Sequence, residues 1–277
     1  MLRKEHTMER KIAFFDIDGT LTSELDGSVP ESTKTAIQKA RQNGHLMFIN
    51  TGRCMQNVEA RFREIGFDGY VCGCGTNIYC TENGKMNEIL HISQPHSVVE
   101  EILNHARKFS LDLLFESKKE VRFDTKHTLI TPGGIRQYQH FVLRNYDMSH
   151  NPEASDFICD KFVVWFSNIQ DLEAFRIVSD KYFTCIDRGG NFREFVPIAY
   201  SKATGIQAVL DFYHIPIENA YALGDSNNDL SMLSYVPNSI AMGNASPTSL
   251  FKQVSYVTTK ASENGIQNAL QHFHFIQ

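Results

Sequence analysis

The sequence has no long hydrophobic run, a single tryptophan and no strong excess of one charge. Its 277 residues carry 27 Lys and Arg against 32 Asp and Glu, a formal net charge of -5. Interspersed charges of both signs form no basic field for nucleic acid or anionic membranes, so we expect neither as a partner. No apolar stretch approaches the roughly 20 residues that span a bilayer. The composition is that of an ordinary soluble globular protein.

Signals for export and for disulfide bonding are also scarce. After a polar tail expected to reach about Arg10, the first apolar run covers only Ile12–Phe15, too short for the core of a signal peptide. Six cysteines in a chain of this length form no dense disulfide framework. Cys72, Cys74 and Cys80 lack the paired Cys-x-x-Cys spacing of a zinc site. We therefore expect free cysteines and a reducing, cytoplasmic location.

The length allows one or two domains, and a change of pattern along the chain favours two. Strands and helices alternate up to about residue 86 and again after residue 190. Between them the sequence predicts short strands and helices of its own, enough for a separate α+β unit. We expect residues 1–86 and 191–277 to form one α/β core and residues 87–190 an inserted α+β domain, with a hinge at Gly189 and Gly190.

The most informative stretch is residues 11–20, KIAFFDIDGT. Ile12–Phe15 is the nearly continuous apolar run of a strand buried on both faces of a parallel sheet. Asp16 and Asp18 follow, with a spacing of two that projects both to the same side, and Gly19 allows a sharp turn. Two carboxylates so close need a nearby cation, or one of them must be neutral. A solvated acidic turn is the alternative reading.

A second apolar run, residues 46–49, ends in Thr51 and Gly52 before a helix predicted over residues 55–65. Free N–H groups at the start of a helix, together with the Thr51 hydroxyl, can bind phosphate oxygens. A plain N-cap explains the same residues equally well.

A lysine stands at an unusual place in the second half of the chain. Ser201 opens a predicted helix over residues 201–212, which puts Lys202 in the first turn. A cation there is unfavourable for the helix dipole, so its position suggests a role beyond helix stability. A single lysine is nevertheless most often a surface residue.

A second acidic strand end follows the apolar run 220–223. Asp225 and Asp229 can face one oxygen-preferring cation, and Asn227 or Asn228 can hydrogen-bond a ligand. An Asx-rich helix cap accounts for one aspartate but hardly for the whole cluster.

Taken in order, these motifs resemble those of the haloacid dehalogenase (HAD) superfamily: Asp-x-Asp-Gly-Thr at 16–20, Thr-Gly-Arg at 51–53, Lys202, and Gly-Asp-Ser-Asn-Asn-Asp at 224–229. The sequence SKATG at 201–205, the continuation to Leu233 and the long insertion are further similar to its Cof-type phosphatases, which carry a type IIB cap. The resemblance spans nearly the full chain. It implies a Rossmann-like parallel-sheet core with an inserted α+β cap, and Mg2+-dependent phosphoryl transfer through an aspartyl phosphate.

The resemblance also implies a role for each motif. Asp16 would be the nucleophile and Asp18 the general acid and base, roles that suit their chemistry. The implied Mg2+ ligands are Asp16, the Asp18 carbonyl, Asp225 and, as a further ligand or support, Asp229. The implied phosphate-binding groups are Thr51, the Gly52 amide, Lys202 and Asn228.

The expected function is hydrolysis of small phosphorylated metabolites, such as sugar phosphates or similar phosphomonoesters, with the cap selecting the leaving group. Two alternatives stay open: a phosphomutase or phosphotransferase, and a sensor that binds a phosphometabolite without turnover. The oligomeric state is not indicated. The arginines at 122, 136, 144 and 188 are candidates for substrate recognition without an assigned role.

Overall fold

A computed structural model describes residues 9–277, so most of the expected N-terminal tail lies outside the described residues. The strands are β1 (Ile12–Phe15), β2 (Leu46–Asn50), β3 (Gly69–Cys72), β4 (Asn77–Glu82), β5 (Lys85–His91), β6 (Leu111–Glu116), β7 (Val121–Phe123), β8 (Lys161–Phe166), β9 (Phe183–Asp187), β10 (Phe192–Pro197), β11 (Ala220–Ser226), β12 (Asn238–Ser246) and β13 (Tyr256–Val257). The helices are α1 (Glu31–Gln42), α2 (Ala60–Arg63), α3 (His96–Ala106), α4 (Pro132–Leu143), α5 (Ile169–Ser179), α6 (Lys202–Tyr213), α7 (Leu230–Tyr235) and α8 (Gly265–His272).

A large sheet forms the core, with strand order β13-β12-β11-β1-β2-β3-β4-β5. The strands from β13 to β3 run parallel, and β4 and β5 add an antiparallel edge. All four residues of β1 are fully buried, as the continuous apolar run predicts for a strand covered on both faces. The predicted Rossmann-like core is confirmed.

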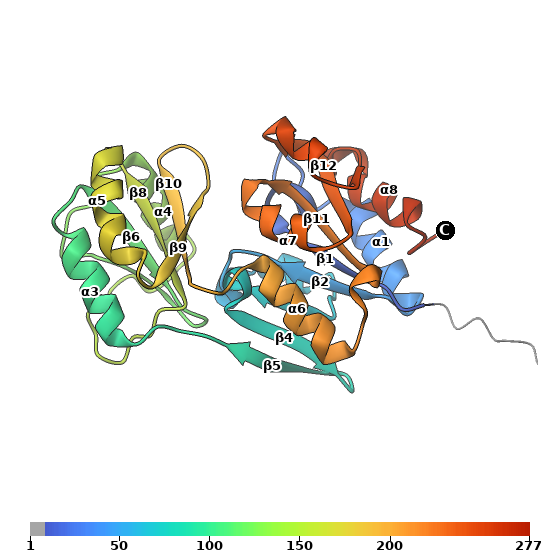
Figure 1. Ribbon diagram of the computed structural model, residues 1–277, viewed down its shortest axis with the longest axis horizontal. Helices are drawn as coiled ribbons and strands as arrows, with labels where there is room; N and C mark the ends of the chain where they lie inside the picture. The colour runs from blue at the N-terminus through green and yellow to red at the C-terminus, as the bar shows by residue number, and fades with distance from the viewer. Residues whose placement is uncertain (1–8) are drawn as a thin grey trace, which may run out of the picture.

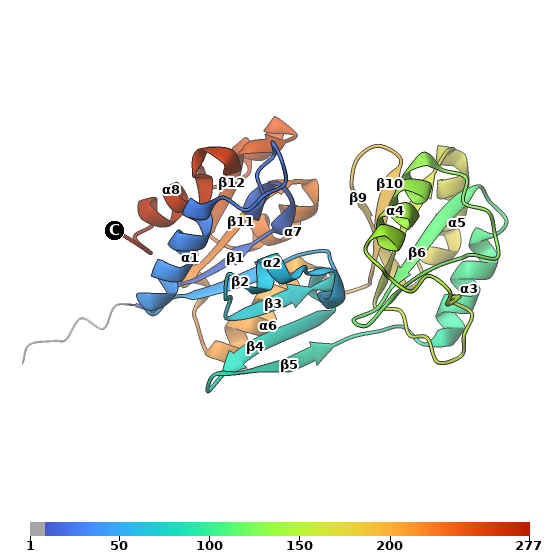
Figure 2. The ribbon, with the colours of Figure 1, turned by 180° about the vertical axis from the view of Figure 1, so that it is seen from behind.

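Helices cover both faces of this sheet (Figures 1 and 2). On one face α1 and α8 pack against alternate residues of the strands, including Phe15 and Ile49. On the other face α6 and α7 pack against Phe14 and Phe48. The period of two along β1 thus sends successive side chains into two separate halves of the core.

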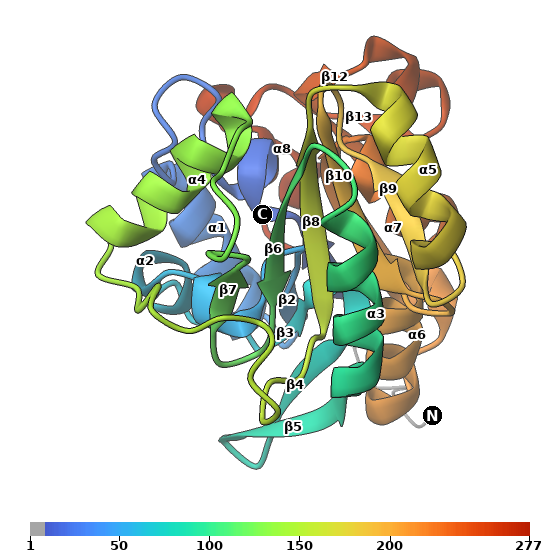
Figure 3. The same ribbon diagram turned by 90° about the vertical axis from the view of Figure 1, so that its left-hand side faces the viewer.

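A second, antiparallel sheet belongs to the insertion, with strand order β7-β6-β8-β10-β9. Helices α3 and α5 bury one face, where Phe162 and Phe195 stack at 4.6 Å. Helix α4 covers part of the opposite face through Phe141 (Figure 3). The part that α4 leaves open includes the middle of β8 and β10 and faces the core.

The strand pairing changes two expected details of the chain path. Gly189 and Gly190 lie in the turn that joins β9 to β10 inside the small sheet, so they are not the hinge back to the core. Strand β5 belongs to the large sheet and β10 to the small one. We propose on this basis that the inserted domain runs from about residue 92 to residue 197.

Two short segments, 92–95 and 198–201, connect the domains, and both contact the turn 73–76. The amide of Ile92 donates to the Thr76 carbonyl at 2.7 Å. A Cβ atom added to Gly75 would lie only 2.3 Å from the Ser201 carbonyl oxygen. This turn includes Cys74 in a left-handed conformation with φ of 54°.

The helix predicted over residues 55–65 is wrong. The structure has a single 3-10 turn at Met55–Asn57 and the short helix α2, separated by extended backbone at Val58 and Glu59. No helix begins at Thr51-Gly52, so these residues do not form the anion site expected at a helix N-terminus. Within residues 9–277, no helix is long and apolar enough to cross a membrane.

Candidate active site

The candidate site lies where β1 and β11, neighbours in the sheet, reach their carboxyl ends. The chain continues from β1 toward β2 on one side and returns as β11 on the other, which makes this the switch point of the parallel sheet. Ligands of open α/β sheets bind at such a point. Asp16 follows β1 directly, and Asp225 lies at the end of β11.

Lys202 holds two of the predicted acidic residues together. Its Nζ atom lies 2.5 Å from Asp16 Oδ1 and 2.6 Å from Asp229 Oδ1, and all three side chains are buried. The second oxygen of Asp229 accepts hydrogen bonds from the amides of Asp225 and Ser226 at 2.9 and 3.2 Å. The lysine in the first turn of α6 is thus a buried partner of the acidic cluster rather than a surface residue.

Helix α6 positions this lysine through its own N-terminus and through the neighbouring strand. Ser201 caps the helix, and its side chain and that of Thr204 exchange hydrogen bonds with each other's backbone. Asn50, at the end of β2, donates to the Lys202 carbonyl at 3.0 Å. The start of α6 is therefore fixed against the sheet edge where Asp16 lies.

The pKa values reflect the crowding of negative charge. Burial, with Asp229 and Asp18 adding to the rise and Lys202 opposing it, raises the pKa of Asp16 to about 6. Burial, together with Asp16 and Asp229, raises the pKa of Asp225 to about 8. Burial opposes the charge on Lys202, but Asp16 and Asp229 outweigh it and raise the pKa of Lys202. The cluster therefore carries more negative charge than one lysine neutralises.

The donor set fits a hard divalent cation such as Mg2+. Asp16, Asp225 and Asp229 each present a carboxylate oxygen within 4.8 Å of the others, and oxygen is the ligand that Mg2+ prefers. Gly19 lies against Asp225: a Cβ atom at this position would be only 2.4 Å from Asp225 Oδ2, so any side chain larger than that of glycine would crowd the carboxylate. A cation here would stabilise the ionised form of Asp225, whose pKa is raised first by burial and then by Asp16 and Asp229.

The side chain of Asp18 points away from this cluster. Arg53 binds it with two hydrogen bonds, Nη2 to Oδ1 at 2.5 Å and Nε to Oδ2 at 3.1 Å. The chain turns tightly over Ile17–Leu21, and this turn leaves the Asp18 side chain 60% exposed while Asp16 is buried. Asp16 and Asp18 line one cavity, but Asp18 is paired with Arg53 whereas Asp16 is paired with Lys202.

Of the predicted phosphate-binding groups, Lys202 contacts Asp16, Thr51 and Gly52 line the same cavity as Asp16, and Asn228 lines a separate crevice. Thr51 is buried, and its hydroxyl accepts a hydrogen bond from the Arg53 amide at 3.2 Å. Among residues 9–277 the Gly52 amide has no hydrogen-bond acceptor, which leaves it available to a ligand. Asn228 lies in the turn Asn227–Asp229, and its side-chain oxygen accepts from the Ser226 hydroxyl.

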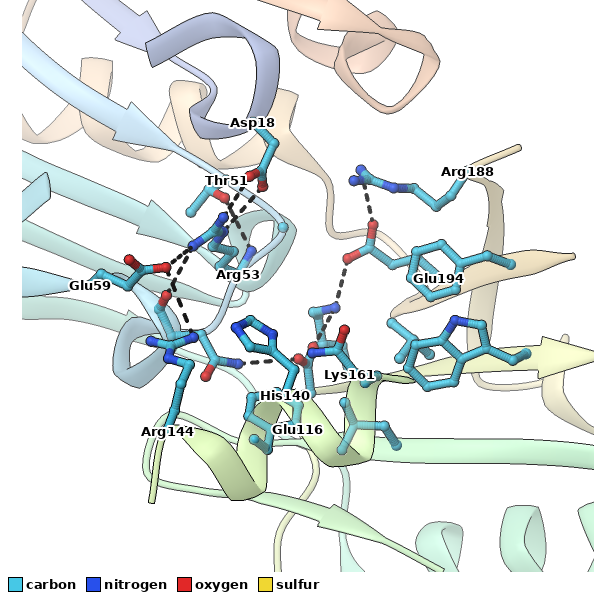
Figure 4. A pocket seen from close by; sticks show the side chains of 18 of the residues that line it. Asp18, Thr51, Arg53, Glu59, Glu116, His140, Arg144, Lys161, Arg188 and Glu194 are labelled. Carbon is cyan, nitrogen blue, oxygen red and sulfur yellow. Dashed lines mark hydrogen bonds and ion pairs between the residues drawn. The ribbon is translucent and has the colours of Figure 1, made fainter. Parts of the chain in front are cut away.

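A cavity of about 260 Å³ opens in front of these groups, between the core and the inserted domain (Figure 4). Asp16, Asp18 and Thr51 line its core side. Residues of β6, β8, β10 and α4 line the other side. The strand residues among them alternate with a period of two, so that one face of the small sheet forms the floor of the cavity. These strand residues are Leu114, Glu116, Lys161, Val163, Trp165, Phe192 and Glu194.

A buried ionic group lies at the inner end of this floor. Lys161 Nζ is 2.5 Å from Glu116 Oε2 and 2.7 Å from Glu194 Oε1. Burial alone would raise the pKa of Glu194, but Lys161 and Arg188 lower it to about 2. Arg53 and this group were not among the predicted site residues. Arg53 belongs to the Thr-Gly-Arg motif, whereas only the alternation along β8 and β10 hints at Lys161 and Glu194, and it does not reveal what they face.

A parallel sheet with an acidic cluster and a buried lysine at its switch point, facing an inserted antiparallel domain, is the architecture of hydrolases that act on phosphate esters. The profile of the haloacid dehalogenase-like hydrolases matches residues 13–270, and the chain belongs to this family.

Individual relatives agree with this membership. The Bacillus subtilis protein named "Putative phosphatase YkrA" is 26% identical over 98% of this chain and 100% of its own. The 5-amino-6-(5-phospho-D-ribitylamino)uracil phosphatase YitU of Bacillus subtilis is 24% identical over 93% of this chain and 95% of its own. The solved structure of the HAD subclass IIB sugar phosphatase BT4131 matches with a TM-score of 0.81 and 24% identity, covering 96% of this chain and 100% of that chain.

The resemblance to Cof-type phosphatases with a type IIB cap is thereby confirmed, and the inserted domain is the cap. The protein is a phosphatase of the HAD superfamily.

Proposed function

We propose that this phosphatase is Mg2+-dependent and hydrolyses small phosphomonoesters, such as sugar phosphates, through an aspartyl phosphate on Asp16. One observation carries the proposal: Lys202 holds Asp16 beside Asp225 and Asp229 at the edge of a cavity whose other side is lined by the cap. A nucleophile, a divalent-cation site and room for a small leaving group are thus in one place.

Asp16 acts on the phosphorus atom. One of its carboxylate oxygens forms a bond to phosphorus while the bond from phosphorus to the ester oxygen breaks, which yields an acyl phosphate and an alcohol. Water then attacks the phosphorus of the acyl phosphate, releases inorganic phosphate and restores Asp16. Mg2+ bound by Asp16, the Asp18 carbonyl, Asp225 and Asp229 would supply positive charge between the carboxylate and the phosphate.

Asp18 donates a proton to the departing ester oxygen and accepts one from the attacking water. Arg53 holds both of its carboxylate oxygens, so this role requires Asp18 to be released from Arg53 within the cavity. Thr51, the Gly52 amide, Lys202 and Asn228 bind the non-bridging oxygens as charge redistributes in the transition state.

The cap excludes bulk water and selects the leaving group. A floor with Trp165 and Phe192 at one end and the Glu116, Lys161 and Glu194 group at the other suits a leaving group with both apolar and hydroxylated parts. A cavity of about 260 Å³ restricts this group to the size of a small metabolite.

The test is a phosphate-release screen of sugar phosphates, nucleotides, pyridoxal phosphate and flavin mononucleotide, each with Mg2+ and with EDTA. We expect release only with Mg2+, and a loss of at least about 10³-fold in Asp16→Asn. The exposed Asp26, hydrogen-bonded to Ser28 near the same strand, provides the matched control Asp26→Asn, which should keep full activity.

Activity that survives Asp16→Asn would contradict the covalent route. Transfer of the phosphoryl group from Asp16 to a sugar hydroxyl, with a new sugar phosphate formed and no inorganic phosphate released, would indicate a mutase or phosphotransferase. Tight binding of a phosphate ester without turnover would indicate a sensor.

A further inference from the structure

We propose that Arg188, in the cap, is a further catalytic residue whose guanidinium donates hydrogen bonds to the phosphoryl group of the substrate held against Asp16. The inference rests on the proposed function of this site. It adds a phosphate ligand from the inserted domain to those expected in the core.

The position of Arg188 places it beside both proposed phosphate-binding loops of the core. It follows β9, in the turn to β10, and lines the cavity that also holds Asp16 and Gly52. It also lines a second crevice of about 350 Å³, whose other side includes Asn228. Arg188 therefore lies between the loop at Gly52 and the loop at Asn228, on the cap side of the nucleophile.

Contacts through Glu194 confirm how close the arginine is to the phosphate loop. A Cβ atom added to Gly52 would lie 2.8 Å from Glu194 Oε1, so the Glu194 carboxylate rests directly on this backbone. The other oxygen, Oε2, is 3.5 Å from Arg188 Nη1. Figure 4 shows Arg188 above Glu194, across the cavity from Asp18 and Thr51.

In the part of the chain that the structure describes, one nitrogen of the Arg188 guanidinium is buried without an acceptor, although the side chain as a whole is 24% exposed. Among residues 9–277, Arg188 Nη1 is shielded from solvent and has no hydrogen-bond partner, since its contact with Glu194 is an ion pair without hydrogen-bond geometry. Glu194 is already engaged by Lys161 at 2.7 Å. A buried donor without an acceptor is costly, and the oxygens of a phosphoryl group match the fork of a guanidinium.

The charges of the core alone do not supply a net positive charge for a bound phosphate. A divalent cation and Lys202 together balance Asp16, Asp225 and Asp229, so a phosphate dianion would meet no surplus of positive charge from the core cluster. Arg53, the arginine of the core that lines the cavity, also pairs with Glu59, which keeps part of its charge engaged even when Asp18 leaves it. Arg188 supplies the missing charge, in the manner of an arginine that enters a phosphoryl-transfer site from a second element.

The experiment compares wild-type protein with Arg188→Gln and Arg188→Lys. Arg193→Gln is the matched control, because Arg193 lies on the same hairpin, pairs with Asp187 at 2.9 Å and does not line the cavity. Two readouts are needed: kcat and KM for an aryl phosphate and a sugar phosphate, and the affinity for inorganic phosphate in the presence of Mg2+, measured by calorimetry.

We expect Arg188→Gln to lower kcat/KM by about 10²-fold for both substrates and to weaken phosphate binding by about tenfold, because the lost contact is to the group that all substrates share. Arg188→Lys should recover part of both effects, and Arg193→Gln should change neither by more than about twofold. If Arg188→Gln does not fold, Arg188→Lys alone decides, with an expected weakening of phosphate binding by a few fold.

Unchanged phosphate affinity in a folded Arg188 variant overturns the proposal, as does a loss restricted to one leaving group. Wild-type protein that releases phosphate from no substrate counts against the proposed function instead. In that case the comparison of phosphate affinities still decides the role of Arg188, and a wild-type protein that binds no phosphate rejects it.

Discussion

Three carboxylates share a small volume at the ends of β1 and β11, and the protonation of Asp16 and Asp225 determines how the site takes up a cation. An unfolded aspartate titrates near pH 3.9, whereas Asp16 and Asp225 in the folded chain titrate at about 6 and about 8. Between these values the folded chain binds protons that the unfolded chain has released. In metal-free protein, the stabilising contribution of these groups is therefore present at low pH and lost as pH rises through about 6 and then about 8.

We predict that Mg2+ stabilises the protein much more at about pH 8.5 than at about pH 5.5, because the first value lies above both pKa values and the second lies below both. At the lower pH a cation must displace protons from Asp225 and Asp16, and at the higher pH the carboxylates are ionised and repel each other. The measurement is the shift of the thermal midpoint on adding Mg2+ to EDTA-treated protein. Asp225→Asn should remove most of the shift, and equal shifts at both pH values would refute the assigned cation site.

The core residues of this site could be read from the sequence, and the cap residues could not. Asp16, Lys202, Asp225 and Asp229 each stand at the end of a strand or the start of a helix, and parallel strands bring such positions to one edge. The Asp18–Arg53 pair depends on the tight turn after β1, which the spacing alone does not show. Arg188 and Glu194 face the site only because of how the two domains meet.

At the scale of the element, α6 is held unusually close to the sheet. A Cβ atom added to Gly205 would lie 2.3 Å from Val71 Cγ1 and 3.3 Å from Gly75 Cα. The glycine lies one turn after Lys202, so its close approach helps to set the height of the lysine above Asp16.

Gly205→Ala should therefore destabilise the protein by about 1–3 kcal/mol, although alanine is the better helix former by about 1 kcal/mol. It should also lower kcat, because α6 must move away from Val71 and takes Lys202 with it. Urea unfolding and phosphate release measure the two effects. Asp211→Ala, on the exposed side of the same helix, should change the free energy of unfolding by less than about 0.5 kcal/mol. A stabilised, fully active Gly205→Ala variant would show that the higher helix propensity of alanine outweighs its steric contact with Val71.

The segment after β2 shows how tertiary contacts override helical periodicity. Val58, Phe62 and Ile65 have helical spacing and are all buried in the core under α1. The chain nevertheless runs extended at Val58, because the Arg53 carbonyl accepts from the Gly73 amide at 2.9 Å and the Arg53 side chain binds Glu59. Sequence pattern identifies which residues are buried here but not the backbone path that buries them.

At the scale of the molecule, the core and the cap have separate hydrophobic interiors. Phe48 belongs to the interior of the large sheet and Phe162 to that of the small sheet. Only residues of the core form the acidic cluster. A ligand stabilises the unit that holds it, so Mg2+ and a cap substitution should act on different parts of the protein.

We predict that Phe162→Ala, which removes a fully buried ring stacked on Phe195, destabilises the cap by about 3–5 kcal/mol and separates calorimetric unfolding into two transitions. Mg2+ should raise only the upper transition, which belongs to the core. Phe48→Ala provides the comparison, since it should lower the transition that Mg2+ affects. A single transition that shifts as a whole in both variants would mean that the two domains unfold as one unit.

The turn 73–76 joins movements of the cap to the chemistry of the core. It touches both connecting segments, and its Cys74 amide donates to the Thr51 carbonyl at 3.0 Å. We therefore expect a rotation of the cap about its two connections to displace this turn and, through it, the loop that holds Thr51 and Gly52. Opening of the cap to admit a substrate should therefore also shift the backbone of the loop that is proposed to bind the phosphoryl group.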